Sequence, residues 1–256
     1  MHQENPILLV NLSDRLLVDF MRCPFRFYWQ HIKKQDQSQH DWRVIVQHIV
    51  NRIINDYYQI PLNKRSAFQV LQLIEKHWRI GIDSFDSKQH YYTTLAKITD
   101  YLVQNLHRSE GLYPPVFLDE KMSVYSEELQ TQLTLTLQVG HWTEKSYSIK
   151  KYLVSDEREI IEFYRNFMIL FCYEAFHELP ECIEIISLLD GKSTLIFPDK
   201  LDVQKARDYL RLFSNALKEP ASYVKSNSPA VCGSCPLYTN CTSGDEKKVN
   251  IGGFIP

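Results

Sequence analysis

Three cysteines lie close together in the late segment VCGSCPLYTNC, at Cys232, Cys235 and Cys241. The turn within a C-x2-C pair brings two sulfurs to one side, so the pair can bind one metal ion or one edge of a cluster. A third cysteine six positions later can reach a neighbouring position on the same group. The spacing therefore predicts a metal or cluster site, and a thiolate cluster requires four ligands.

The other three of the six cysteines have different sequence surroundings. Cys172 lies in an apolar helical stretch and Cys182 begins an apolar β-branched stretch, so both are expected in the core, where a free thiol behaves as a small hydrophobe. Cys23 precedes a proline at a helix break, between Arg22 and Arg26, and is the expected fourth ligand. Zinc sites more often have a second close cysteine pair or a pair of histidines. The pattern favours an iron–sulfur cluster, with structural zinc as the alternative.

A group bound by Cys23 and Cys232 would join segments that are 209 positions apart. Loop-closure entropy makes such a link worth about 5 kcal/mol when the native geometry is unstrained. The expected role of the site is therefore structural.

The predicted compartment also favours metal binding over disulfides. The first residues, MHQENPILLVNL, contain acid and amide side chains in place of a basic leader. No stretch reaches the ~18 apolar residues of a membrane span. We therefore expect a cytoplasmic protein without membrane association, and disulfides are rare in that compartment.

Composition excludes two classes of protein. The chain has 256 residues, of which 44% are hydrophobic and only 8 are glycine, which excludes a disordered or low-complexity chain. Its 29 Lys and Arg residues against 31 Asp and Glu residues give a net charge of −2. A strongly basic nucleic-acid-binding surface is therefore not expected, although a local basic groove stays compatible with this balance.

Hydrophobic periodicity predicts the elements that position the cysteines. Helices are expected from an N-cap at Ser13, from Pro24, and over 41–58, 66–80 and 91–106. Strands are expected over 116–124, 129–139 and 146–154, followed by a buried helix over 156–176, a hairpin of strands at 182–189 and 193–197, and a helix over 202–217. This order predicts one mixed α/β (α+β) domain over 1–256. Its parts are a helical region at about 12–110, a core at about 115–217 and a cysteine-rich tail at about 220–256.

The segment 12–32, LSDRLLVDFMRCPFRFYWQHI, resembles the opening of RecB-like nucleases of the PD-(D/E)XK superfamily. It is most similar to the iron–sulfur branch of RecB/Cas4/AddB-like proteins, in which one early cysteine and three late ones hold a 4Fe-4S cluster. The resemblance implies Cys23, Cys232, Cys235 and Cys241 as cluster ligands. It also implies a restriction-endonuclease-like core sheet with a helical insertion.

Nucleases of this type hold Mg²⁺ or Mn²⁺ with two acids and place a lysine beside the developing phosphate charge. The resemblance matches His48 to a histidine on an early helix and Glu120 to the first acid. Thr143 stands where a Gly-x-x-Asp motif has its aspartate. On the next strand, Lys150 matches the motif lysine with Ser148 in place of the acid, or, in another register, Lys150 replaces the acid and Tyr152 the lysine. This strand contains no carboxylate. His48, Glu120 and Lys150 are therefore candidates for a vestigial catalytic site.

Two alternatives concern individual residues of this site. Acids from neighbouring turns, such as Glu144, Asp156 and Glu157, could replace the missing ligands. His48 could instead be a buried core histidine, because it lies on the apolar face expected for helix 41–58. Loss of both acids nevertheless favours a degenerate site, since a hydroxyl is a poor substitute for a carboxylate on Mg²⁺.

The favoured hypothesis is a non-catalytic iron–sulfur protein that acts as a DNA-binding or scaffolding subunit in DNA processing, repair or defence. Its expected partners are DNA, or a protein such as a helicase or nuclease subunit. The first alternative is a divergent but active deoxyribonuclease that requires Mg²⁺ or Mn²⁺. The second is a redox- or iron-sensing interaction module.

Overall fold

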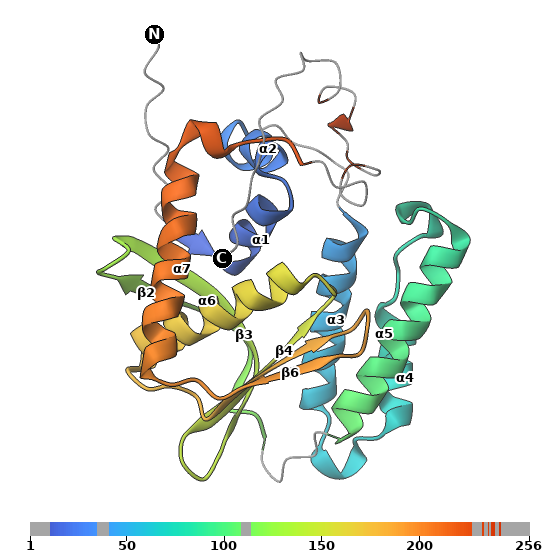
Figure 1. The fold of residues 1–256 in the computed structure, drawn as a ribbon. Coiled ribbons are helices and arrows are strands. Elements are labelled where there is room, and N and C mark those ends of the chain that lie inside the picture. Colours follow the sequence, from blue (N-terminus) through green and yellow to red (C-terminus); the bar gives the residue numbers. More distant parts are fainter. Residues whose placement is uncertain are drawn as a thin grey trace.

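The computed structural model describes residues 11–34, 41–108 and 114–226, together with Cys232, Cys235, Leu237, Tyr238 and Cys241. The predictions for the first ten residues and for the remainder of the tail lie outside the described residues. The strands are β1 (Asn11–Ser13), β2 (Phe117–Ser126), β3 (Thr131–Trp142), β4 (Tyr147–Leu153), β5 (Cys182–Ser187) and β6 (Ser193–Ile196). The α-helices are α1 (Asp14–Arg22), α2 (Pro24–Phe27), α3 (Trp42–Gln59), α4 (Ala67–His77), α5 (Lys88–Arg108), α6 (Arg158–Phe176) and α7 (Lys200–Lys218). Figure 1 shows their arrangement.

Short polar side chains begin several of these helices, as their sequence predicts. The Ser13 side chain accepts a hydrogen bond from Leu16 N at the start of α1. Pro24 occupies the first turn of α2, where its missing N–H leaves no gap in the hydrogen bonding. Asp199 and Asp202 form a reciprocal capping box at the start of α7.

One mixed sheet of six strands forms the centre of the molecule. β3 pairs antiparallel with β2 along its length, and on its other side it pairs with β1 and with β4. β4 and β5 are parallel and are connected through α6, while β5 and β6 form an antiparallel hairpin. The fold is therefore mixed α/β, as the sequence predicts.

Two groups of buried side chains pack on this sheet. The larger group joins α1, α6 and α7 to the strands, with Leu133, Leu135 and Leu137 of β3 pointing into it. The second group is formed by α3, α4 and α5 and includes Val139 and Tyr152 from the sheet. In Figure 1, α3, α4 and α5 accordingly stand together beside the sheet, and α6 crosses it.

The structure differs from the sequence prediction in several details. β1 was not predicted; it has three residues and exists because it pairs with β3. α7 begins at Lys200 instead of 202, because Asp199 is its N-cap. Cys172 is fully buried as predicted, whereas Cys182 is half-buried, since it lies at the first position of β5 opposite Ser148.

Among the described residues, no helix is long and apolar enough to cross a membrane.

Candidate functional site

Cys23, Cys232, Cys235 and Cys241 line a single pocket in the folded chain. The other described residues around it are Phe25, Arg26, Ser226, Leu237 and Tyr238. The four cysteines that the sequence singled out are thus brought together, although Cys23 and Cys232 are 209 positions apart. Cys172 and Cys182 are not part of this pocket.

Local hydrogen bonds position the four thiols. Cys23 is the residue between α1 and α2, and its sulfur accepts a hydrogen bond from Arg26 N at 3.4 Å. On the late segment, Cys235 N donates to Cys232 O at 3.2 Å and Cys241 N donates to Leu237 O at 2.7 Å. These two turns bring the late cysteines back toward one side of the chain.

Contacts between the early and late segments hold the pocket together. Phe25 N donates to Val224 O at 3.0 Å. The Tyr223 ring is stacked on Phe27, with centroids 6.1 Å apart, and meets Phe20 edge-on at 5.9 Å. This aromatic contact fixes the segment that follows α7 against α1 and α2.

The proximity of the thiols affects their acidity. Burial raises the pKa of Cys232, and the negative charge of the other three thiolates raises it further. Burial also raises the pKa of Cys241, with smaller contributions of the same sign from Cys23 and Cys235. A raised pKa keeps these thiols protonated, and neutral, unless a positive group such as a metal centre lies beside them.

The set of donor atoms fits an iron–sulfur cluster. It comprises four thiols, and its surroundings include the apolar side chains of Phe25 and Leu237. Within the described part of the chain, no group of three or more His, Cys, Asp or Glu side chains is arranged to hold a metal ion. Four thiolates are the ligand set of a structural zinc ion as well as of a 4Fe-4S cluster, so the donor types suit either group.

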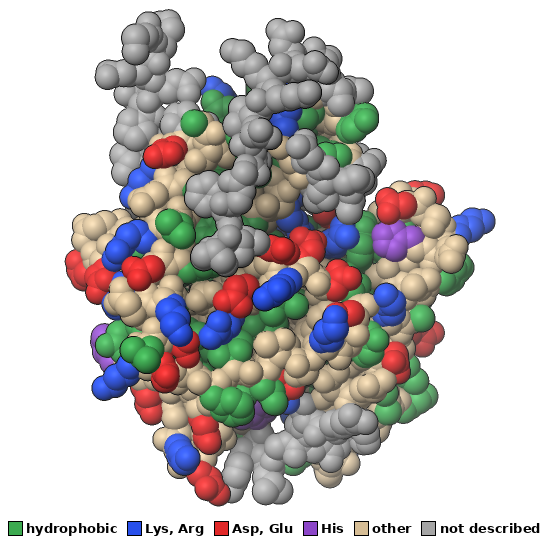
Figure 2. Space-filling view, viewed as in Figure 1, with side chains coloured by type: hydrophobic (Ala, Val, Ile, Leu, Met, Phe, Trp, Pro, Cys, Tyr) green, Lys and Arg blue, Asp and Glu red, His purple; other side chains and the backbone are tan. Residues whose placement is uncertain are grey.

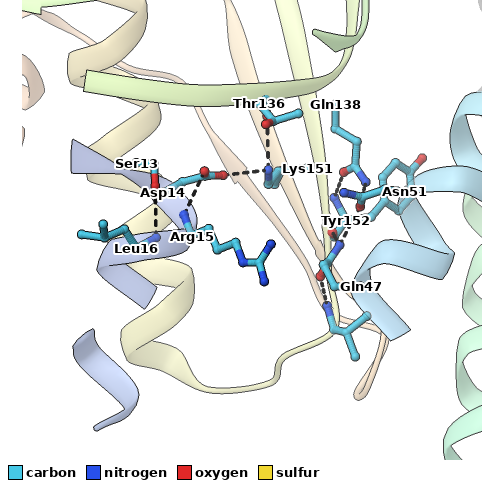
Figure 3. Close-up of polar contacts among 11 residues, drawn as sticks. Ser13, Asp14, Arg15, Leu16, Gln47, Asn51, Thr136, Gln138, Lys151 and Tyr152 are labelled. Carbon is cyan, nitrogen blue, oxygen red and sulfur yellow. Dashed lines mark hydrogen bonds and ion pairs between the residues drawn. The ribbon is translucent and has the colours of Figure 1, made fainter. Parts of the chain in front are cut away.

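The second candidate site is a gap between β1 and β4, which pair with different parts of β3. β1 pairs with β3 at 132–134 and β4 pairs with β3 at 139–142, on the same side of β3. Among the described residues, no strand pairs with residues 135–138 of β3 on that side. Figure 3 shows side chains from β3, β4, α1 and α3 filling this gap.

Neutral amides occupy the part of the gap that faces α3. Gln138 Oε1 accepts a hydrogen bond from Tyr152 N at 2.6 Å, in place of a strand partner. Gln47 accepts from Val154 N at 2.8 Å and donates to Tyr152 O at 2.9 Å. Gln47 and Gln138 both donate to Asn51 Oδ1 at 2.9 Å. These amides are engaged with the backbone and with each other, and none carries the negative charge that Mg²⁺ prefers.

A buried ion pair fills the other part of the gap. Lys151 Nζ lies 3.3 Å from Asp14 Oδ2 and donates to Thr136 O at 3.2 Å. It also lies 5.0 Å from the centre of the Tyr164 ring. Burial, followed by the negative charge of Asp14, raises the pKa of Tyr164 well above its usual range. Asp14 is a carboxylate, but Lys151 already neutralises it.

The three vestigial candidates do not come together at this gap. Glu120 lies opposite Leu137 and Lys150 lies opposite Val139, and these two β3 residues belong to cores on opposite faces of the sheet. Lys150 Nζ forms an ion pair with Glu184 Oε2 at 3.0 Å. Glu120 is exposed.

His48 and Thr143 are also in positions that differ from those expected. His48 is exposed on α3, with Nε2 3.4 Å from Arg15 Nη1, so the prediction that it lies on the apolar face is wrong. The buried stripe of α3 instead passes through Val46, Ile49 and Ile53. Thr143 lies in the turn after β3, where its hydroxyl accepts from Ser146 N at 3.0 Å.

Sequence patterns do not single out the residues that fill the gap. Gln138 is 2% exposed, yet it occupies a polar position of the alternating pattern in β3, as Gln132, Thr134 and Thr136 do. The alternation in β3 passes through this position without interruption, so it does not reveal where β4 moves away.

No family model matches the sequence, and a search of curated proteins finds no relative. One matching solved structure is a protein from Eubacterium rectale described as "Putative exonuclease". It is 9% identical, with a TM-score of 0.49, and the match covers 94% of this chain and 91% of that chain. At this identity and TM-score, the likeness does not assign a function to this chain.

Proposed function

We propose that this chain is an iron–sulfur protein with a nuclease-like fold whose catalytic site is degenerate, and that it acts as a DNA-binding or scaffolding subunit. The observation that carries the proposal is the pocket shared by Cys23, Cys232, Cys235 and Cys241. Together, these residues would provide the four thiolates of a 4Fe-4S cluster. Such a group supplies a rigid link between four thiolates and can accept an electron.

The side chains in the strand gap support the proposal that the catalytic site is degenerate. Metal-dependent hydrolysis of a phosphodiester needs carboxylates that bind the ion and orient it beside water. Gln138, Gln47 and Asn51 supply neutral oxygens that are already hydrogen-bonded, and Asp14 is neutralised by Lys151. Glu144, Asp156 and Glu157 are described, and none of them belongs to a group of three or more described His, Cys, Asp or Glu side chains that could hold a metal ion.

The surface charge supports a role that depends on a partner. Figure 2 shows Lys and Arg side chains mixed with Asp and Glu side chains across the visible face. The net charge of the chain is −2. Tight autonomous binding of DNA depends on many phosphate contacts, so a mixed surface favours weak binding or binding through a protein subunit.

The first experiment purifies the full chain without oxygen and measures iron, acid-labile sulfide and zinc for each chain. We expect about four irons and four sulfides, with absorbance near about 400 nm. Stoichiometric zinc without sulfide would refute the cluster.

The second experiment incubates the same protein with labelled single- and double-stranded DNA and Mg²⁺ or Mn²⁺. We expect no cleavage, and weak binding in fluorescence anisotropy that decreases as salt increases. Metal-dependent cleavage that is lost in Glu120→Gln or Glu144→Gln would establish the active nuclease instead.

A further inference from the structure

Arg26 is a buried cation beside the cysteine pocket. It lies in α2, three positions after Cys23, and is 7% exposed. Its side chain lines the pocket together with the four cysteines. The guanidinium is therefore removed from water at the place where the thiols meet.

No described residue supplies a negative partner for this guanidinium. The Nε atom of Arg26 is buried without a hydrogen-bond partner, and no described carboxylate lies within 4.0 Å of its side chain. Arg22, one turn earlier, is also buried, but it lies 4.0 Å from Asp41 Oδ2. Lys225, the other cation close to the pocket, donates to Cys241 O and lies over the Phe25 ring.

An unpaired charge in such a position is strongly unfavourable, because burial removes its hydration without replacing it. The groups that can become negative here are the four thiols. Arg26 lines the pocket with all four of them, and its backbone N donates to Cys23 Sγ at 3.4 Å. Geometry and charge therefore indicate that Arg26 and the thiolates compensate each other.

We propose that Arg26 is the positioning residue and counter-charge of the thiolate-bound cluster. This inference rests on the proposed iron–sulfur function. Four thiolates give a 4Fe-4S centre a net negative charge, and one-electron reduction makes that charge larger. Arg26 thus stabilises the bound centre and favours its reduced form, because charge and hydrogen bonds near the sulfurs set the reduction potential of such groups.

The test compares Arg26→Gln with Arg26→Lys and the unchanged chain. Arg79→Gln is the matched control, since Arg79 is exposed in the segment after α4 and its replacement changes the net charge equally. Each full-length protein is loaded with iron and sulfide without oxygen. Its reduction potential is measured by titration with dithionite, and its rate of iron loss to EDTA is recorded.

We expect Arg26→Gln to have a more negative reduction potential and to lose iron about 10-fold faster than the unchanged chain. Arg26→Lys should fall between them, because it keeps the charge but loses the planar donor group. Arg79→Gln should match the unchanged chain. Equal potential and equal iron loss in Arg26→Gln and Arg79→Gln would overturn the inference.

Two further outcomes separate the inference from the proposed function. If the unchanged chain binds no iron and sulfide, the proposed function fails, whatever Arg26 does. If Arg26→Gln does not fold, as judged by circular dichroism, the inference is tested by comparing Arg26→Lys with Arg79→Gln. Faster iron loss in Arg26→Lys than in Arg79→Gln supports the role of Arg26, and identical behaviour overturns it.

Discussion

Lys151 of β4 and Asp14 of α1 form an ion pair inside the sheet, with Nζ and Oδ2 3.3 Å apart and the two side chains 6% and 12% exposed. Asp14 directly follows β1, so this pair connects the end of β1 to β4 in the middle of the sheet. Figure 3 shows that the pair and the amides of Gln138 and Gln47 occupy neighbouring parts of one strand gap. The polar groups in this gap are therefore engaged in holding the fold together.

Removal of Lys151 should strongly destabilise the protein. Lys151→Met leaves the Asp14 carboxylate buried without its cation, and we expect a loss of about 3–5 kcal/mol in the free energy of unfolding. Urea denaturation followed by circular dichroism measures this loss. The matched control is Lys205→Met, because Lys205 is 71% exposed in its pair with Asp202 and should cost less than about 1 kcal/mol. Equal costs for the two variants would contradict the structural role of Lys151.

The amide of Gln138 should be important for stability. Gln138→Leu leaves the buried Tyr152 N–H without its acceptor, and the unsatisfied donor alone should cost about 1–3 kcal/mol. Gln104→Leu is the control, since Gln104 is exposed on α5 and bonds only to Asp100 among the described residues. Thermal unfolding should show a clearly lower Tm for Gln138→Leu. A Tm equal to that of Gln104→Leu would show that the gap does not depend on this bond.

Each of the four pocket cysteines should be required for iron binding. Cys23→Ser or Cys235→Ser should reduce the iron content and remove the increase in Tm that iron gives to the unchanged chain, because a group that binds only the folded state stabilises it. Cys182→Ser is the control, since Cys182 is half-buried on β5 and outside the pocket. Undiminished iron in Cys23→Ser would remove Cys23 from the ligand set.

Stability should decrease at alkaline pH because of Cys172. Burial raises the pKa of this thiol to about 12, compared with about 8.5 for an exposed thiol. Above about pH 8.5 the unfolded state releases a proton that the folded state retains, so the free energy of unfolding falls. The contribution of one such group approaches 1.36 kcal/mol per pH unit and ends near pH 12.

The measurement for Cys172 is the free energy of unfolding at several values between about pH 7.5 and pH 10. Cys172→Ala should have a smaller slope above about pH 8.5 than the unchanged chain, even if it is less stable at neutral pH. If the free energy of unfolding falls with pH at the same slope in both proteins, groups other than Cys172 cause the loss of stability at alkaline pH.

Local sequence chemistry predicted most of the elements, the meeting of the four pocket cysteines and the burial of Cys172. The helix start at Ser13 follows from a side chain that accepts a backbone hydrogen bond, so it is visible in a single sequence. β1 was not predictable in this way, because three residues become a strand only by pairing with β3. The pocket was predictable because its four cysteines share one residue type, and three of them have a distinctive spacing.

The strand gap shows where sequence reasoning fails. The register in which β4 leaves β3 depends on long-range pairing, and one position of error moves a side chain to the other face of the sheet. Glu120 and Lys150 were therefore considered together although they belong to opposite faces. The polar residues that do meet there, such as Gln47 and Asn51, carry no motif that distinguishes them from surface amides.

The contact between Phe25 and Val224 has a consequence for the order of events during synthesis. Cys23 leaves the ribosome long before Cys232, and at about 5–20 residues per second the 209 positions between them take about 10–40 s. During this time the early thiol waits without its partners, exposed to oxidants and to competing metal ions. Assembly of the proposed cluster would therefore follow translation, and a chain interrupted before Cys232 would lack three of the four proposed ligands.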